Sequence, residues 1–343
     1  MNAKIIRKKD IASFLDSLLK DYEVFAPVKR DEVVAFDRIR SASEAFLDYT
    51  NSAKPPKEIA LPQAETLFTY STTDNTASVE TPPPQDKLTL LFGIRPCDAR
   101  SFLLLDKVFN GERYKDVYYL NRRAKMIVVA LGCTKPGATC FCTSVGGGPF
   151  SSEGSDLLLI DIGDDYIVQI ITDKGAKLLE DRRLGNAGEG ELALMRTVIR
   201  EAKESMSPGI EIDGLKEKLD KMFDDPVWGS LSEKCFSCGV CTYLCPTCYC
   251  FDIIDEGRDS GGERIRIWDS CQFPLFTLQA SGVNPRPAAK ERYRQRIMHK
   301  FSYCLDNYGQ IGCVGCGRCI TECPVNLDIR QVLTTLFDTE VAK

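Results

Sequence analysis

Two cysteine motifs with the same spacing lie in the last third of this 343-residue chain. Each motif has three cysteines separated by two residues, then a fourth cysteine that precedes a proline. The eight cysteines are Cys235, Cys238, Cys241 and Cys245 in the first motif, and Cys313, Cys316, Cys319 and Cys323 in the second. Thiolates at this spacing bind [4Fe–4S] cubanes in bacterial ferredoxins, and such clusters store and transfer single electrons. Zinc ribbons do not fit, because they need two Cys-x-x-Cys pairs separated by about a dozen residues or more.

The fourth cysteine of each motif points away from its own loop, and in two-cluster ferredoxins it therefore ligates the other cluster. On this basis the first cubane is assigned to Cys235, Cys238, Cys241 and Cys323, and the second to Cys313, Cys316, Cys319 and Cys245. Gly239, Gly315 and Gly317 stand where a side chain would crowd a cluster. The repeat departs from a compact ferredoxin because an insert, residues 246–312, separates its halves.

The insert adds further cysteines beside the motifs. Cys248, Cys250 and Cys271 are candidates for a further metal cluster or a redox-active thiol group, since cysteines in a reducing compartment commonly do one or the other. The alternative is that they are small buried residues, because free cysteine packs well. For Cys304 a buried core thiol is the preferred interpretation.

A basic stretch at Lys290–Lys300 closes the insert and contains His299, the only histidine. Charge runs of this kind usually form a solvated helix face. The functional alternatives are a docking face for an acidic electron-transfer partner, or counter-charge for the anionic clusters. His299 either packs as an ordinary histidine or tunes a cluster through a hydrogen bond.

A second group of cysteines lies in the N-terminal half. Its members are Cys97, Cys133, Cys140 and Cys142, here called the tetrad. Cys97 and Cys133 each follow a short apolar run, at 87–94 and 126–131, that is predicted to be a buried strand. Ligand sites in open parallel sheets gather at the carboxyl ends of strands, so these thiols should face one crevice. The tetrad suits a third cubane, with a structural zinc or a redox-active thiol pair as alternatives.

The elements that must position these cysteines follow from hydrophobic periodicity. Helices are predicted at 11–19, 98–109, 191–204 and 215–223, and hairpins at 22–36 and 156–172. Residues 51–87 are rich in proline, serine and threonine, which predicts an extended surface arm. From residue 232 onward we expect only short regular elements.

This pattern predicts an α/β (α+β) fold for an N-terminal domain, residues 1–187, that carries the tetrad. A helical linker segment follows at 188–231. Residues 232–343 are predicted to form a bacterial ferredoxin-like 4Fe-4S dicluster domain with the long insert.

Composition narrows the classes of function. The net charge of −5 argues against a nucleic-acid-binding protein, and a single histidine excludes sites built on histidine pairs. No dinucleotide or Walker motif occurs, so no flavin or nicotinamide site of its own is recognised. Because neither a signal peptide nor a long apolar run is present, we expect a cytoplasmic protein without a membrane span. In that compartment many of the sixteen cysteines are expected to be ligands or redox groups rather than disulfides.

Several segments together carry a family resemblance. They are GIRPCDAR (93–100), CFCTSVGGGP (140–149), CFSCGVCTYLCPTCYCFD (235–252), WDSC (268–271), NPR (284–286), HKF (299–301) and CVGCGRCITECPVN (313–326). The set resembles the beta subunit of cytosolic sulfhydrogenases, and the related iron–sulfur subunit of anaerobic sulfite reductase is similar. The resemblance implies an iron–sulfur subunit between a catalytic subunit of the hydrogenase or sulfite reductase type and a flavin-containing, NAD(P)H-linked subunit. It also favours a functional tetrad and leaves Cys304 outside the pattern.

Three functions remain to be separated. We favour an electron-transfer subunit that has no catalytic residue of its own. The rival is an enzyme that reduces a small sulfur or disulfide substrate at the N-terminal thiols. The third is a scaffold whose clusters are structural and do not cycle between redox states.

Overall fold

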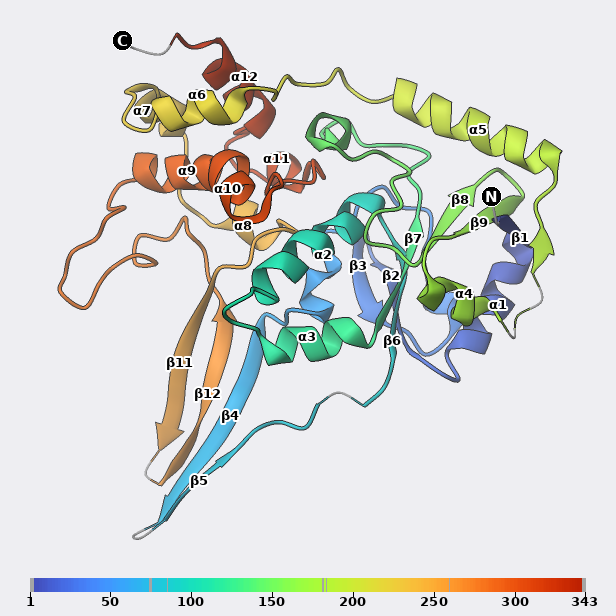
Figure 1. Cartoon of the computed structure of the whole chain (residues 1–343), viewed down its shortest axis with the longest axis horizontal. Coiled ribbons are helices and arrows are strands. Elements are labelled where there is room, and N and C mark those ends of the chain that lie inside the picture. Colours follow the sequence, from blue (N-terminus) through green and yellow to red (C-terminus); the bar gives the residue numbers. More distant parts are fainter. Residues whose placement is uncertain are drawn as a thin grey trace.

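A computed structural model describes residues 3–73, 76–84, 86–180, 182, 184–258 and 260–340 of the chain. One large sheet lies at one end of the molecule, and the helices of the cysteine motifs gather at the other (Figure 1). A second sheet projects from the body on the side of the motif helices, below them in Figure 1. The predicted order, a mixed α/β part followed by helices, is confirmed.

The large sheet has the strand order β10-β1-β9-β8-β7-β6-β2-β3. Its strands are β1 (Ala3–Arg7), β2 (Glu23–Arg30), β3 (Val33–Arg38), β6 (Thr89–Ile94), β7 (Met126–Leu131), β8 (Leu157–Asp161), β9 (Asp165–Ile170) and β10 (Gly185–Asn186). The four strands from β2 through β6 and β7 to β8 are parallel neighbours, and the outer strands pair antiparallel. Both predicted hairpins and both predicted buried strands are therefore confirmed.

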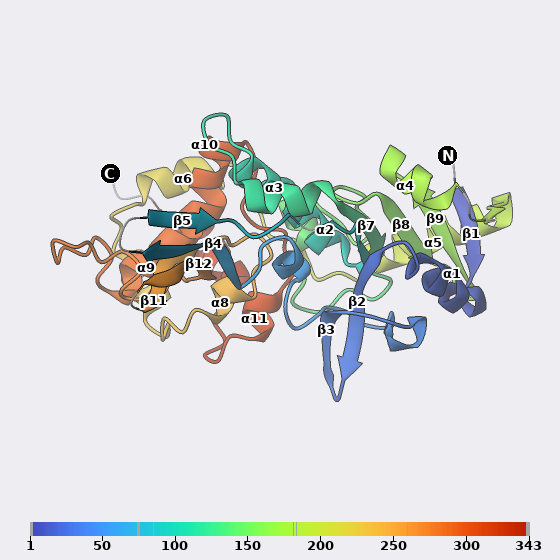
Figure 2. The same cartoon turned by 90° about the horizontal axis from the view of Figure 1, so that it is seen from below.

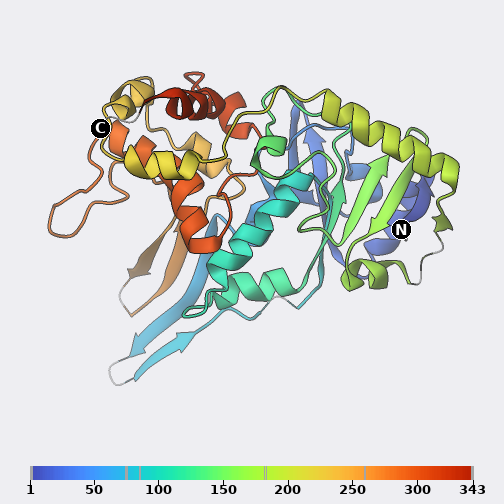
Figure 3. The same ribbon diagram turned by 45° about the horizontal axis from the view of Figure 1, so that its top comes forward.

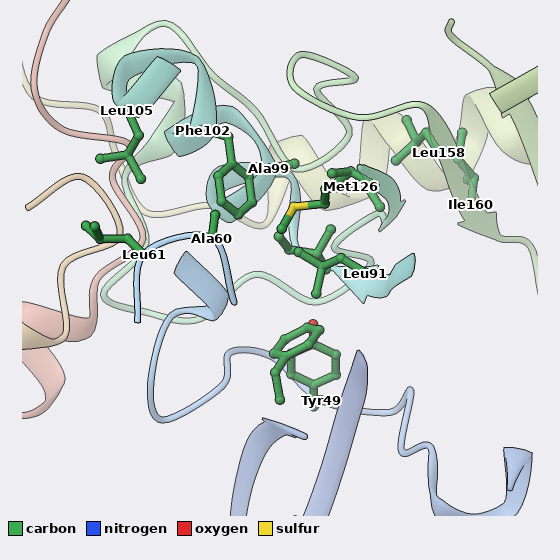
Figure 4. Packing of buried hydrophobic residues seen from close by; sticks show 14 of the residues in the cluster. Tyr49, Ala60, Leu61, Leu91, Ala99, Phe102, Leu105, Met126, Leu158 and Ile160 are labelled. Atoms are coloured by element: carbon green, nitrogen blue, oxygen red, sulfur yellow. The ribbon is translucent and has the colours of Figure 1, made fainter. Parts of the chain in front are cut away.

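Helices cover both faces of the large sheet, which is why β6 and β7 are buried along their whole length. The helices here are α1 (Ile11–Leu18), α2 (Pro96–Phe109), α3 (Val117–Ala124), α4 (Asp173–Leu179) and α5 (Glu189–Glu204). Leu91 and Val128 pack with α2, α3 and α5, whereas their neighbours Leu90 and Val129 pack with α1 and α4. Figure 4 shows the first of these cores, with Phe102 of α2 near Met126 of β7.

The second sheet is antiparallel and has the order β11-β12-β4-β5. It joins β4 (Ala64–Thr73) and β5 (Thr76–Glu80) to β11 (Phe251–Arg258) and β12 (Gly261–Trp268). The extended surface arm predicted at 51–87 contains β4 and β5, which are extended and largely exposed. The sequence did not indicate that β4 pairs along its length with β12 of the insert. The expectation of only short elements after residue 232 was wrong, since β11 and β12 have eight residues each. Residues 74, 75 and 85 of the predicted arm lie outside the described residues.

The base of the second sheet is fixed to the body by buried charges. Arg266 of β12 forms ion pairs with Glu65 of β4 and with Asp116, which caps α3. Arg122 of α3 also pairs with Glu65, at 2.5 Å. One sheet thus contains strands from both sides of the predicted boundaries at 187 and 231, and those boundaries stay predictions.

The cysteine motifs lie among short helices (Figures 2 and 3). These are α6 (Leu215–Lys221), α7 (Val227–Ser232), α8 (Val240–Tyr243), α9 (Ala289–Met298), a π-helical turn (His299–Tyr303), α10 (Cys304–Tyr308), α11 (Arg318–Thr321) and α12 (Ile329–Asp338). Their common core includes Trp228, Phe301 and Leu333, and it takes in Phe141 from the tetrad loop. The predicted helices at 191–204 and 215–223 correspond to α5 and α6.

Candidate functional site

The two ferredoxin motifs have the same local backbone. In each, the second residue after the first cysteine has positive φ, +56° at Ser237 and +64° at Gly315, and its N–H donates to that cysteine's sulfur at 3.4 Å. Gly239 and Gly317 have φ of +79° and +78° and precede the short helices α8 and α11. Positive φ favours glycine, so each loop turns at the position where the sequence has Gly239 or Gly317.

A pocket lies at the first motif. It is lined by the four thiols assigned to the first cubane, Cys235, Cys238, Cys241 and Cys323. The pocket also borders Cys319 of the second motif, so the two predicted cubane sites are adjacent. Burial raises the pKa of Cys241 to about 12, and Arg296 opposes this shift. A buried thiol of this kind loses its proton readily only when a metal ion replaces that proton.

Two buried polar groups line the same pocket without a hydrogen-bond partner among the described residues. They are the hydroxyl of Tyr293 and Nε of Arg296, both from α9. A buried donor without a hydrogen bond lowers the stability of the fold. These two donors beside four thiols therefore need an acceptor. The sulfides of a bound cluster are acceptors of this kind, and the residues of the pocket therefore fit a [4Fe–4S] group.

The thiols assigned to the second cubane lie deeper. Cys313 and Cys316 are buried, and burial raises the pKa of Cys313 to about 11. Cys245 accepts a hydrogen bond from Nζ of Lys300 at 3.2 Å. A hydrogen bond from Cys248, followed by the charge of Lys300, holds the pKa of Cys245 well below its ordinary value. Lys300 thus supplies positive charge where an anionic centre is predicted.

Within the tetrad, Cys133 is near each of the other three thiols, because it acts on the pKa of Cys97 and of Cys142 and the charge of Cys140 acts on its own. Cys97 lies in the first turn of α2, directly after β6, and Cys133 follows β7, which is the parallel neighbour of β6. Burial raises the pKa of Cys133 to about 11, and the thiolate charge of Cys140 adds to the shift. Burial also raises the pKa of Cys142 to about 12, with the charges of Cys133 and Cys140 contributing next.

Across the ranges that the structure describes, no three His, Cys, Asp or Glu side chains are placed to hold a single metal ion, at the tetrad or at the two motifs. The cubane, the zinc site and the redox-active thiol pair therefore stay alternative predictions for the tetrad.

The tetrad loop lies directly against the second motif. Phe141 N donates to Gly315 O at 2.9 Å, and the thiol of Cys140 lies 3.7 Å from Cys316 O. Beside this contact Arg318, between two motif cysteines, forms a bidentate ion pair with Asp98 at 2.6 Å for both oxygens. Both side chains are almost wholly buried. The sequence did not reveal this pair, although Arg318 stands inside one motif and Asp98 follows Cys97.

Replacing Gly315 with alanine should weaken this contact. A Cβ there would lie 2.5 Å from Cys142 N and from the carbonyl carbon of Phe141, which is too close for backbone to tolerate. Gly309→Ala is the matched control, since Gly309 also has positive φ (+66°) but open space around its Cβ position. Both variants carry the cost of positive φ, about 1–2 kcal/mol, and Gly315→Ala should lose about 1–3 kcal/mol more from overpacking. If denaturant unfolding shows the same loss of stability in both variants, the close contact between Gly315 and the tetrad loop is refuted.

The basic stretch does not form a uniformly solvated face. Arg296 and Lys300 are buried among the motif thiols, whereas Lys290 is exposed and Arg294 stacks on Phe223 at 3.8 Å. The solvated-face interpretation was wrong for the buried side chains, and their position favours the counter-charge alternative.

His299 is packed as an ordinary histidine would be. Its Nε2 is 2.9 Å from the hydroxyl of Tyr249, and the two rings meet edge to face. Burial, followed by the charge of Lys300, lowers the pKa of His299 to about 4.

Of the insert cysteines, Cys271 is buried and Cys248 and Cys250 are half-buried. Cys250 and Cys271 share a hydrogen bond, which lowers the pKa of Cys271 to about 6, and Cys248 lies beside Cys245. Cys304 is buried 2.7 Å from where a Cβ of Gly312 would stand, and burial raises its pKa to about 11 while the charge of Lys300 opposes the shift. All sixteen cysteines are free thiols.

Comparisons with known proteins agree with this geometry. Residues 234–327 match the family described as the 4Fe-4S dicluster domain. Over 326 residues the chain is 31% identical to a protein of Pyrococcus furiosus named Sulfhydrogenase 2 subunit beta, covering 93% of this chain and 94% of that protein. No solved structure matches the chain. Among the described residues, no helix has both the length and the apolar character that crossing a bilayer requires.

Proposed function

Because the chain belongs to the family of sulfhydrogenase beta subunits and contains a 4Fe-4S dicluster domain, we propose that it relays single electrons within a redox complex of the cytoplasm. The bound clusters supply one-electron storage, at potentials set by charge, burial and hydrogen bonds to their sulfurs. No residue of the chain is given a catalytic role.

The proposal assigns each cubane its own thiols. Cys235, Cys238, Cys241 and Cys323 hold the first, Cys313, Cys316, Cys319 and Cys245 the second, and Cys97, Cys133, Cys140 and Cys142 a third. Tyr293 and Arg296 direct their unpaired donors toward the first, and Lys300 sets positive charge beside the second. Hydrogen bonds and cations of this kind stabilise the more reduced, more negative form of a cluster.

The observation that carries the proposal is the contact between the tetrad loop and the second motif. Phe141 and Cys140 meet the backbone of Gly315 and Cys316 with no other element between them. Electrons could therefore pass from one motif to the other and on to the tetrad without leaving the protein interior. Three centres in a row suit a relay better than a catalytic site.

The partners follow from the family. The relative's name identifies it as one subunit of a sulfhydrogenase. We propose that this chain stands between a flavin-containing subunit, which exchanges electrons with NAD(P)H, and a catalytic subunit of the hydrogenase or sulfite reductase type.

Iron and sulfide analysis of the anaerobically purified full chain tests the proposal. We expect about eight iron atoms from the dicluster and about four more from the tetrad, counting four per cubane. Redox titration followed by EPR should show that the clusters cycle reversibly. Bound zinc with iron near zero would overturn the proposal, and clusters that never change redox state would leave a structural scaffold.

A second candidate function has one observation in its favour. A cavity at the carboxyl ends of the parallel strands is lined by Tyr49, Arg95 and Gly132, beside Cys133 of the tetrad. Nε of the buried Arg95 has no partner among the described residues. Such a pocket could admit a small sulfur or disulfide substrate.

A Cys97→Ala variant separates the two functions. With reduced viologen as electron donor, the relay predicts no reduction of polysulfide or of a small disulfide by the isolated chain. Activity in the parent chain that is lost in Cys97→Ala would favour the enzyme instead.

A further inference from the structure

The first motif contains the most accessible thiol of the chain. Of the sixteen cysteines, all of which lie within the described residues, Cys238 alone is exposed. Cys238 borders the pocket assigned to the first cubane. Phe236, two residues earlier, borders the same pocket and is 74% exposed. A cluster bound in this pocket would therefore come close to the surface on a side where an aromatic ring also faces solvent.

A loop between β12 and α9 lies beside Cys238 and projects from the body (Figures 1 and 3). It spans residues 273–287 and is here called the insert loop. The phenylalanine ring of its first residue lies 2.7 Å from where a Cβ of Gly239 would stand. The carbonyl of its last residue accepts a hydrogen bond at 2.7 Å from Arg292, which also donates to the hydroxyl of Ser237. Both ends of the insert loop are thus linked to the two residues that flank Cys238.

The insert loop is closed by its own hydrogen bonds, yet it exposes apolar side chains. Asn284 donates to Pro274 O at 2.7 Å and accepts a hydrogen bond from Thr277 at 2.8 Å. Three large apolar side chains of the loop face solvent, and they are Leu275 (73% exposed), Leu278 (49%) and Val283 (59%). Closed surface loops are frequently functional, and apolar side chains gathered at the surface are typical of contacts with another protein.

The chain segments around Cys238 have no charged side chains. Neither the first motif, 235–245, nor the segments at 270–285 and 323–327 contain Lys, Arg, Asp or Glu. The arginines of α9 that reach the motif, Arg292 and Arg296, are buried. A partner that brought its own anionic cluster to this face would need cations between the two anions, because like charges repel across an interface. The face instead matches an uncharged redox group, such as the apolar edge of a flavin ring.

We propose that the insert loop and Phe236 form the docking surface for the flavin-containing subunit, so that electrons enter this chain through the first cubane. The inference rests on the proposed relay and adds which centre meets the flavin. NAD(P)H bound to the partner is oxidised, giving two electrons and a proton. The proton goes to solvent, and the electrons pass one at a time from the flavin to the cluster, which is reduced by one electron in each step. Because the contact is uncharged, its strength should change little with salt.

The test uses the full chain, purified anaerobically, and the purified flavin-containing subunit of its complex. The double variant Leu275→Asp/Val283→Asp places two carboxylates in the proposed contact. Val79→Asp is the matched control, because Val79 is 64% exposed on β5, an edge strand of the second sheet. We expect the double variant to bind the flavin-containing subunit at least about 30-fold more weakly, which is the scale of losing a strong interface anchor. The control should bind it as tightly as the parent chain does.

Cluster reduction separates this surface from the relay itself. In the double variant NAD(P)H should reduce the clusters more slowly, whereas dithionite should reduce them as fast as in the parent chain and the iron content should be unchanged. If the double variant binds the flavin-containing subunit as tightly as the parent, the docking surface is wrong and the relay still stands. If dithionite does not reduce the clusters of the parent chain, the relay itself is wrong.

Photocrosslinking provides a second measurement if the double variant fails to fold. Phe236→p-benzoylphenylalanine keeps an aromatic ring at the proposed contact and makes it photoreactive. In the assembled complex we expect a covalent product with the flavin-containing subunit, and Val79→p-benzoylphenylalanine should give none. A product with the catalytic subunit or with a second copy of this chain would overturn the proposal, as would the absence of any product from position 236.

Discussion

Arg318→Ala should destabilise the chain by about 3–5 kcal/mol, because it leaves the carboxylate of Asp98 buried without its cation. Asp98 is 1% exposed, and Arg318 binds both of its oxygens at 2.6 Å. The same guanidinium donates to the carbonyl and the hydroxyl of Ser52. The substitution therefore removes both the ion pair and the hydrogen bonds by which Arg318 of the second motif binds Asp98 and Ser52.

Arg264→Ala is the matched control for this loss. Arg264 also forms a bidentate pair, with Asp255, but both side chains are more than 40% exposed. Exposed pairs of this kind contribute little to stability, so this variant should lose much less than Arg318→Ala. Anaerobic guanidinium unfolding followed by circular dichroism measures both variants. If Arg318→Ala lowers the free energy of unfolding by no more than Arg264→Ala does, the buried pair does not hold the tetrad side and the second motif together.

Cys316→Ala should lose about four iron atoms per chain, which corresponds to one cubane. Cys316 is a proposed ligand of the second cubane, and its carbonyl oxygen lies 3.7 Å from the thiol of Cys140. The loss should therefore also interrupt electron transfer between the first cubane and the tetrad. Iron analysis measures the first effect, and stopped-flow reduction followed by cluster absorbance measures the second.

Cys238→Ala provides the comparison for the route. Cys238 is an exposed thiol of the first motif, remote from the tetrad contact, and its loss should remove a similar amount of iron. Electron exchange between the second cubane and the tetrad should survive in this variant. If Cys316→Ala keeps the iron content of the parent chain, the ligand assignment is wrong. If both variants slow the reduction of the tetrad cluster equally, the proposed order of electron transfer is wrong.

The thiol motifs and the strands that carry the tetrad could be predicted from the sequence because their signals are local. The runs at 87–94 and 126–131 are continuous and apolar, which central parallel strands require. The spacing of the eight motif cysteines likewise indicates a chemistry without reference to the rest of the chain.

The remaining contacts depend on residues far apart in sequence, and periodicity cannot reveal them. The pairing of β4 with β12 joins a segment that looks like a linker to a segment inside the insert. Lys57 stands in the stretch KPPKE, which is typical of a surface turn, yet the fold buries it against cysteines 188 and 191 residues away. Nothing in its neighbours along the chain indicates that burial.

The shared second sheet also has a consequence for biogenesis. Thr66 of β4 bonds to Glu263 of β12, 197 residues further along the chain. During synthesis, β4 and Lys57 therefore leave the ribosome long before their partners exist, and distant pairings of this kind form late. The tetrad thiols are synthesised before the second motif, so the interior around them is incomplete until the second motif has been translated. Metal loading is thus expected to follow release of nearly the whole chain, and a truncated chain should expose β4 as an aggregation-prone edge.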